Sequence, residues 1–371
     1  MKCGIITLFG TNNYGNRLQN YAVEQILLDL GVQEVSTHLI TVSEDHMQSI
    51  GILRKFIPAR LYTLYDFVYE VISGKMTMKR SKYFKKFNHD YIHVKRIYVK
   101  SYKELCCNNE IQNNDFFIVG SDQVWNPCLT MGTDLYFLKF VPHEKRVALC
   151  ASIGSTELEK KYIESFKQGI DGMKYISVRE EAAIDIIKQF SNQDVDLFLD
   201  PTFLINIEKW FALIKKPAFP IPQKYIVAFF LNEEPQISLR LCKNKMQCDI
   251  IYLNNKNYED FYVLGPSEFL YMIKNAEMIL TDSFHATVFS ILFHKQFYVY
   301  PRKQKDPQYM FTRFDTLLTK FSLSDRVQDR DNFKEKTQIS EEQYHEIDDM
   351  IKTEQEKVRI ILNKVFNGEQ L

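Results

Sequence analysis

The chain has 371 residues, a length that favours two domains, and its 45% hydrophobic and 25% charged residues are ordinary for a globular protein. Its formal net charge at pH 7 is zero, so net charge does not predict long-range attraction to nucleic acid, and no nucleic-acid partner is expected. The sequence contains no run of about 18 uncharged apolar residues, so no membrane-spanning helix is expected.

The cysteines and the first residues of the chain indicate a cytoplasmic protein. The seven cysteines are odd in number, with no CxxC pair and no histidines grouped near them, which argues against a disulfide framework and against a zinc site. The first ten residues, MKCGIITLFG, read as the start of a strand, because their apolar stretch is too short for a signal peptide. We expect a reducing compartment, no bound metal and no cofactor.

The first predicted unit is a strand, a polar loop and a helix. The strand covers residues 3–9, the loop covers 10–16, and the helix runs from about Arg17 to Leu30 and ends at Gly31. The loop GTNNYGN matches neither the dinucleotide fingerprint nor the P-loop. It could present backbone N–H groups and asparagine amides to a ligand, and a plain tight turn is the alternative interpretation.

A helical insertion is expected over about residues 45–100. Residues 59–93 have a helical pattern and include the cationic stretch KMTMKRSKYFKK. Because the cations alternate with apolar and aromatic positions, a solvated helix face is the preferred interpretation, and a partner site is the alternative.

From residue 115 onward, strands and helices alternate. Strands are predicted for the segments DFFIVG, RVALCASIG, KYISV, VDLFLD, KYIVAFF, DIIYL, EMILT and FYVYP. Residues 214–223 contain three prolines and are the predicted linker. The sequence therefore predicts an α/β fold with parallel sheets in two domains, 1–215 and 216–335, followed by a helix within 336–371. The expected ligand site is the cleft between the domains.

Polar residues follow two strands of the first predicted domain. Ser121, Asp122 and Gln123 come directly after DFFIVG, where Asp122 is either a functional group or a helix cap. Arg179 follows the strand KYISV. Its guanidinium could hold a carboxylate or phosphate. The alternative is a salt bridge with one of the nearby carboxylates, Glu180, Glu181 or Asp200.

The most informative stretch of the second domain is ILTDSFHATVFSILF, residues 279–293. A short apolar strand leads into a turn with Asp282 and Ser283, and a helix follows. If Ser283 is the N-cap, His285 lies in the first helical turn, where free N–H groups favour an anion and disfavour imidazolium. A neutral histidine there can exchange protons near pH 7. The alternative is a capping serine next to a packed histidine.

Cations gather after the last predicted strand. Residues 300–314 include Arg302, Lys303, Lys305 and Arg313, which are either a phosphate clamp or part of a solvated loop. Because the polar and cationic residues of both domains all follow strand ends, the pattern as a whole predicts a cleft that binds a small anionic molecule.

Five motifs in this order, NNYGNRLQNYA, FIVGSDQVWNP, SVREEA, LDPTFL and GPSEFLYMIKNAEMILTDSFHATVFSILFHKQF, resemble the polysaccharide pyruvyl transferases from about residue 3 to about 326. The resemblance implies two Rossmann-like domains arranged like a GT-B glycosyltransferase, with the acceptor side in the first domain, the donor side in the second and the last helix packed back on the first. It also implies phosphoenolpyruvate as co-substrate and a sugar diol of a cell-surface polysaccharide, such as an exopolysaccharide or capsule, as acceptor. Lipid-linked oligosaccharides are included among the acceptors, with peripheral membrane contact through them.

The resemblance also implies roles for individual residues. His285 matches the histidine of the family's second domain and is the expected acid or base, with Asp122 as a second catalytic candidate. Arg179 matches the arginine of the S-V-R motif and Arg313 an arginine that follows the last strand, and both are expected to hold the anionic groups. The further predicted substrate-binding residues are Asn13, Tyr14, Gly15, Asn16, Gln19, Ser121, Gln123, Ser283, Phe284, Arg302 and Lys303.

One departure from the family pattern bears on the donor. Many members have Arg-Leu-His where this chain has Ser283, Phe284 and His285. Either Arg302, Lys303 or Arg313 replaces the missing charge, or the donor differs. Two alternatives therefore stay open beside a pyruvyl transferase: a GT-B glycosyltransferase with a nucleotide-sugar donor, and a non-catalytic sugar-binding protein of the same fold.

Overall fold

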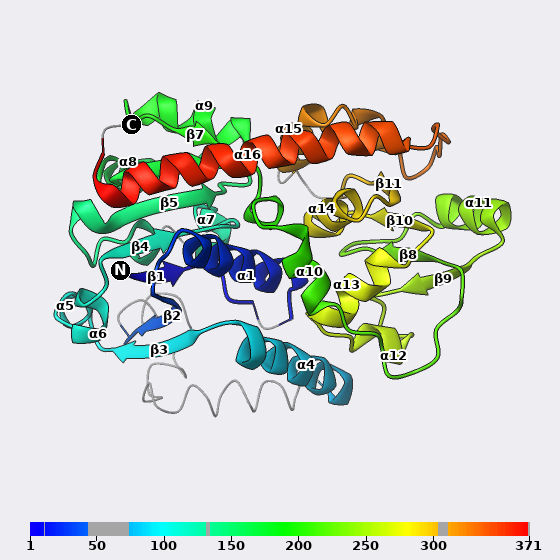
Figure 1. Ribbon diagram of the computed structural model, residues 1–371, viewed down its shortest axis with the longest axis horizontal. Helices are drawn as coiled ribbons and strands as arrows, with labels where there is room; N and C mark the ends of the chain where they lie inside the picture. The colour runs from blue at the N-terminus through cyan, green and yellow to red at the C-terminus, as the bar shows by residue number, and fades with distance from the viewer. Residues whose placement is uncertain (11, 44–73, 131–133, 303–310, 370–371) are drawn as a thin grey trace.

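The computed structural model describes residues 1–10, 12–43, 74–130, 134–302 and 311–369. Its strands form two parallel sheets (Figure 1). The seven-stranded sheet has the order β3-β2-β1-β4-β5-β6-β7. Its strands are β1 (Lys2–Ile6), β2 (Glu34–Val42), β3 (Val94–Val99), β4 (Phe116–Val119), β5 (Arg146–Ala151), β6 (Tyr175–Val178) and β7 (Asp196–Leu197).

The four-stranded sheet has the order β11-β10-β8-β9. Its strands are β8 (Tyr225–Phe229), β9 (Asp249–Tyr252), β10 (Met278–Thr281) and β11 (Gln296–Val299). Every paired strand in both sheets is parallel. Strands β4, β6 and β8 are buried along their whole length, as expected for parallel sheets covered on both faces. We call each sheet with its helices a lobe, the N-terminal and the C-terminal lobe.

Helices alternate with the strands in both lobes. The N-terminal lobe has α1 (Tyr14–Asp29), α4 (Lys75–Tyr91), α5 (Tyr102–Cys106), α6 (Asn109–Gln112), α7 (Pro127–Thr130), α8 (Lys160–Asp171), α9 (Glu181–Phe190) and the 3₁₀ turns η3 (Asp134–Phe137), η4 (His143–Lys145) and η5 (Pro201–Phe203). The connecting helix is α10 (Ile207–Leu213), and the C-terminal lobe has α11 (Gln236–Met246), α12 (Glu259–Tyr262), α13 (Pro266–Lys274), α14 (Phe284–Leu292), α15 (Thr312–Lys320) and η6 (Ser324–Arg326). The last helix is α16 (Glu341–Asn367).

Three elements differ from the prediction. Helix α1 begins at Tyr14 rather than at Arg17, because the Asn13 side chain accepts a hydrogen bond from the Asn16 N–H and caps the helix inside the predicted loop. Residues 94–99, placed in the helical insertion, form β3 at the edge of the sheet. The predicted helix over 59–93 corresponds to α4 from Lys75 onward, and its first part lies outside the described residues.

One hydrophobic core connects the two lobes. The same cluster of buried side chains includes Leu18 and Ala22 of α1, Phe289 of α14 and Leu362 of α16. Figure 1 shows α16 lying across both lobes, and hydrogen bonds tie its two ends to them. Tyr344 Oη donates to the Lys295 carbonyl oxygen of the C-terminal lobe, and Lys174 Nζ of the N-terminal lobe donates to the Val365 carbonyl oxygen. Within the part of the chain that is described, no helix is long and apolar enough to cross a membrane.

Candidate functional site

The turn between β10 and α14 has the predicted form. Ser283 occupies the N-cap with extended backbone, and the helix begins at Phe284, so His285 lies in the first turn. The Ser283 side chain makes no capping hydrogen bond. Its backbone N–H instead donates to Thr281 Oγ1 at 3.0 Å. The first-turn N–H groups of α14 are therefore not capped by this serine hydroxyl.

His285 is buried where the two lobes meet. Its imidazole packs on Gly15 of α1, because a Cβ added to Gly15 would overlap Nδ1. On the other edge of the ring, Nε2 lies 3.8 Å from Asp200 Oδ2, which is too long for a hydrogen bond. Among the described residues, Nε2 has no hydrogen-bond partner. The ring is thus held between α1 and the loop after β7, with one nitrogen left unsatisfied.

Arg179 forms the centre of a buried charge cluster. Its side chain is fully buried, and Nη1 donates to the same Asp200 Oδ2 that faces His285. Nη2 donates to Asp122 Oδ1 at 2.8 Å. Nε lies 3.9 Å from Glu180 Oε2. Of the two interpretations that the sequence left open, the salt bridge with Asp200 is present, and Asp122 is a second partner.

The charges of this cluster shift its pKa values. Burial alone would raise the pKa of Asp122, but the guanidinium of Arg179 and the other cations around it lower that pKa to about 2. Burial lowers the pKa of the His285 imidazole. The carboxylates of Asp200 and Asp122 oppose this shift, and the neighbouring guanidiniums add to it. His285 therefore stays uncharged down to a lower pH than an exposed histidine does, while the carboxylates of Asp122 and Asp200 stay ionised.

The first loop is tied to the cluster through Asn16. Asn16 Nδ2 donates to Asp122 Oδ2, so this carboxylate is held from both sides and does not cap a helix. Gln19 Nε2 donates to Thr7 Oγ1 at 2.9 Å, and Thr7 Oγ1 donates to the Ser121 carbonyl oxygen at 3.0 Å. The two predicted strand-end motifs of the N-terminal lobe therefore form one network.

Two guanidiniums lie close to the ring of Phe284, the first residue of α14. The Cζ atom of Arg179 lies 5.0 Å from the centroid of the Phe284 ring, and that of Arg313 lies 5.2 Å from it. Arg313 is in the first turn of α15 rather than in a loop, and its Nη1 is 4.0 Å from Asp122 Oδ1. Burial and the nearby Arg179 charge lower the pKa of Arg313 to about 10. Arg313 therefore places a buried cation beside residue 284.

The other predicted residues lie at the edge of this cluster or form structural contacts. Tyr14 stacks on Phe269 with ring centroids 4.4 Å apart and donates to the Leu264 carbonyl oxygen. Gln123 Oε1 accepts from Asn126 Nδ2 within its own loop. Arg302 Nε donates to the Asp282 carbonyl oxygen at 3.1 Å, at the end of β10.

Lys303, like Lys305, lies outside the described residues. The structure thus brings together His285, Arg179, Asp122, Asn16, Gly15, Phe284 and Arg313. Gln123 is instead hydrogen-bonded within its own loop, and Tyr14 is held by a hydrogen bond and a stacked ring.

Two buried residues of the site were not predicted. Asp200 was considered only as a salt-bridge partner of Arg179, yet it faces both Arg179 and His285. Arg17 was expected to start a helix, yet its guanidinium is fully buried beside the Phe9 ring and donates to the Leu8 carbonyl oxygen at 3.0 Å. For Asp200, the usable signal is a carboxylate that directly follows a strand and precedes a proline.

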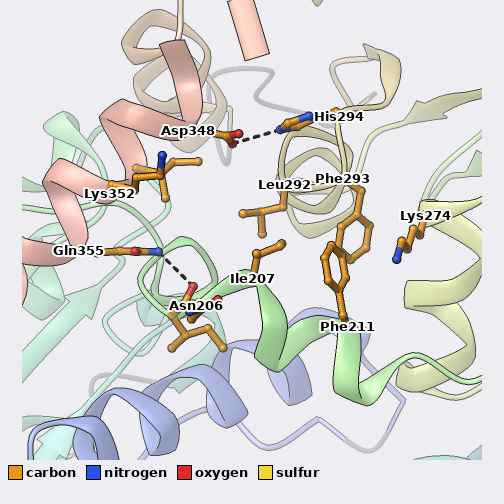
Figure 2. A pocket seen from close by; sticks show the side chains of 12 residues that line it. Asn206, Ile207, Phe211, Lys274, Leu292, Phe293, His294, Asp348, Lys352 and Gln355 are labelled. Atoms are coloured by element: carbon orange, nitrogen blue, oxygen red, sulfur yellow. Dashed lines mark hydrogen bonds and ion pairs between the residues drawn. The ribbon is translucent and has the colours of Figure 1, made fainter. Parts of the chain in front are cut away.

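A separate pocket of about 400 Å³ lies where α10, the end of α14 and α16 meet (Figure 2). Figure 2 shows the Phe211 and Phe293 rings on one side and the His294–Asp348 pair, 3.1 Å apart, on another. None of the predicted site residues lines it. Across the described ranges, no group of three or more histidine, cysteine or acidic side chains is arranged to hold a metal ion.

The sequence model of a protein family described as polysaccharide pyruvyl transferase matches residues 13–304. Among solved structures, the chain is similar to a putative UDP-N-acetylglucosamine 2-epimerase from Listeria monocytogenes, with 9% identity, a TM-score of 0.50 and coverage of 100% of this chain and 98% of that chain. It is also similar to the UDP-GlcNAc 2-epimerase from Neisseria meningitidis bound to UDP-GlcNAc, with 12% identity, a TM-score of 0.45 and coverage of 99% and 94%. A third similar structure is the E. coli ADP-heptose lps heptosyltransferase II, with 8% identity, a TM-score of 0.35 and coverage of 98% and 100%. No curated protein matches the chain.

These findings confirm the predicted fold class. The two parallel sheets and the full-length likeness to the Listeria protein describe an α/β fold with a GT-B-like arrangement. Since the identity to that protein is 9%, the likeness concerns the fold alone.

Proposed function

Because the chain belongs to the polysaccharide pyruvyl transferase family, we propose that it transfers a pyruvyl group from phosphoenolpyruvate to two hydroxyls of a sugar in a polysaccharide repeat unit, forming a pyruvate ketal. The observation that carries this proposal is the meeting of His285 and Arg179 at one oxygen of Asp200. An imidazole of the C-terminal lobe and a buried charge cluster of the N-terminal lobe meet at the junction of the lobes, and this meeting supports the proposal.

The reaction needs an acid, a base and fixed positive charge. A proton adds to C3 of the enol and one sugar hydroxyl adds to C2. The C2–O bond to phosphate then breaks, and a second hydroxyl adds to C2 with loss of its proton. One diol and one phosphoenolpyruvate become one ketal and one phosphate. Uncharged His285 is the group we assign to proton transfer with the sugar hydroxyl, since an imidazole near neutrality suits this role.

Arg313 is the cation that we assign to the donor's carboxylate or phosphate. Arg179 is already surrounded by three carboxylates, so we assign it to holding the acidic groups of the site rather than the donor. Among the described residues, Arg313 has only one carboxylate oxygen within 4.0 Å, and its Nε has no hydrogen-bond partner. Its position over Phe284 also supports it as the replacement for the family arginine that is absent at Ser283.

The proposal is tested by incubating the protein with phosphoenolpyruvate and a panel of oligosaccharides, both free and lipid-linked. We expect phosphate release together with a mass gain of one pyruvyl ketal on a sugar. The variant His285→Ala should lower the rate roughly 100-fold or more, the range expected when an acid–base group is lost. His345→Ala, which removes an exposed histidine of α16, is the matched control and should keep the full rate.

Two outcomes would count against the proposal. Turnover of a nucleotide sugar, with no phosphate released from phosphoenolpyruvate, would indicate a glycosyltransferase. An undiminished rate in His285→Ala would remove His285 from the chemistry.

A further inference from the structure

Asp200 occupies the junction between the catalytic candidate and the buried charge cluster. It follows β7 and precedes η5, and its side chain is almost fully buried. Oδ1 accepts from the Thr202 N–H at 3.0 Å and from Thr202 Oγ1 at 2.6 Å. Oδ2 accepts from Arg179 Nη1 and faces His285 Nε2 at 3.8 Å. One oxygen is therefore anchored within its own turn, and the other lies between a guanidinium and an imidazole.

This placement gives the two ring nitrogens different surroundings. Nε2 faces a carboxylate that can only accept a hydrogen bond, which favours the proton on Nε2. Nδ1 faces Gly15, at the start of the helix that follows the first loop. With the proton on Nε2, Nδ1 carries the lone pair and is the nitrogen able to accept a proton from a hydroxyl.

We propose that Asp200 is a positioning residue for His285: it directs the Nε2 edge of the ring away from the substrate, selects the tautomer with a basic Nδ1, and stabilises the imidazolium that forms when Nδ1 takes a proton. This inference rests on the proposed function, in which His285 exchanges a proton with the sugar hydroxyl. We expect the separation, which is 3.8 Å here, to shorten when the ring becomes charged, because catalytic hydrogen bonds are often long in ligand-free sites. Arg179 keeps Asp200 ionised and in place.

The other charged groups that face His285 do not take over this role. Asp122 is engaged by Arg179 and Asn16. Arg313, like Arg179, carries a positive charge and cannot accept a proton or stabilise imidazolium. Among the residues that the structure describes, Asp200 is thus the carboxylate closest to a ring nitrogen of His285.

The test is nitrogen NMR of ¹⁵N-histidine-labelled protein at pH 7, with the His285 signals assigned by their loss in His285→Gln. The two tautomers of neutral imidazole have distinct nitrogen shifts. We expect the wild type to carry the proton on Nε2 and Asp200→Asn to lose this preference. In the transfer assay, Asp200→Asn should lower kcat by roughly 100-fold with little change in KM, the effect expected when a reacting group is misplaced.

Asp196→Asn is the matched control. Asp196 lies on β7 just before Asp200 and accepts a hydrogen bond from Tyr175 Oη at 2.8 Å. The same chemical change there should leave both the His285 tautomer and kcat unchanged. If Asp200→Asn fails to fold, Thr202→Val takes its place, since it removes one anchor of Oδ1 and keeps the charge. It should weaken the tautomer preference and lower kcat.

The inference is overturned if wild-type His285 carries its proton on Nδ1, or if the tautomer is the same in the wild type and in the folded Asp200 or Thr202 variant. The NMR measurement needs no turnover. Failure of the wild type to release phosphate from phosphoenolpyruvate would therefore refute the proposed function separately, whatever the tautomer of His285.

Discussion

At the scale of single residues, the absence of a side chain at Gly15 allows the two lobes to pack closely at this point. It lies in the first turn of α1, and the His285 ring of the other lobe occupies the space in which a side chain would stand. The backbone of Gly15 does not need positive φ, so its lack of a side chain matters here only for this contact. The position is therefore a sensitive test of the junction.

We predict that Gly15→Ala destabilises the protein although alanine is the better helix former. Helix propensity alone would stabilise α1 by up to about 1 kcal/mol. The added Cβ would overlap His285 Nδ1, and an overpacked buried contact costs roughly 1–3 kcal/mol. Urea unfolding should therefore show a net loss of stability. The transfer assay should show a lower rate.

The control is a double-mutant cycle. In a His285→Ala background the overlapping ring is absent, so Gly15→Ala should be neutral or stabilising there. If Gly15→Ala lowers stability equally in both backgrounds, there is no steric overlap between residue 15 and the His285 ring.

Local and non-local features of the site differ in how far the sequence predicts them. The first-turn position of His285 was predictable, because a strand end and a helix start are adjacent in the chain. The contact between His285 and Asp200 was not, because it depends on how the lobes pack. For Arg179, the sequence left an anion site and a salt bridge open, since neighbouring carboxylates fit either interpretation, and only the fold brings Asp122 to Nη2.

At the scale of elements, α16 links the lobes. Besides the hydrogen bonds at its ends, Gln355 Nε2 donates to the carbonyl oxygens of Phe203 and Ile205 in the segment that leaves the N-terminal lobe. Glu354 Oε1 accepts from the Leu199 N–H, close to Asp200. Helix α16 therefore holds the loop that carries Asp200, the carboxylate next to His285, by hydrogen bonds on both sides of it.

The helical pattern of this segment was predictable from its residues, whereas its packing on the first domain was implied by the family resemblance alone. In α1, the loop-like residues before Arg17 form the first turn because Asn13 caps it. Strand β7 is only two residues long, Asp196–Leu197, although VDLFLD has the composition of a full strand. Its remaining residues leave the sheet to place Asp200, an outcome set by tertiary packing rather than by β-propensity.

We predict that packing along α16 carries much of its stabilising effect. Leu362 is fully buried in the core that the lobes share, whereas Ile360, on the same helix, is 51% exposed. Leu362→Ala should lower the free energy of unfolding by about 2–5 kcal/mol, the cost of removing a buried leucine. Ile360→Ala, the matched control, should change it by no more than about 0.5 kcal/mol. Similar losses for both variants, measured by urea unfolding, would mean that the helix is not docked as described.

At the scale of the whole molecule, the alternation of strands and helices predicted two parallel sheets, and both are present. The alternation does not specify how tightly the sheets are joined. That depends on side chains such as Tyr14, which belongs to α1 but lies among aromatic rings of the other lobe, with the Phe229 ring 5.6 Å and the Phe269 ring 4.4 Å from its own. Since one hydrophobic cluster contains buried residues of both sheets, we expect the lobes to unfold together.

Tyr14 allows this expectation to be tested with two variants. Tyr14→Phe keeps the stacked ring and removes the hydroxyl that donates to the Leu264 carbonyl oxygen, so it should cost about 1 kcal/mol and preserve a single unfolding transition. Tyr14→Ala also removes the ring from the junction and should cost roughly 3–5 kcal/mol, as for other large buried aromatic side chains. If the junction couples the lobes, calorimetry of Tyr14→Ala should resolve two transitions where the wild type has one. A single transition in Tyr14→Ala, with a loss no larger than in Tyr14→Phe, would mean that the lobes are coupled elsewhere, with α16 as the next element to test.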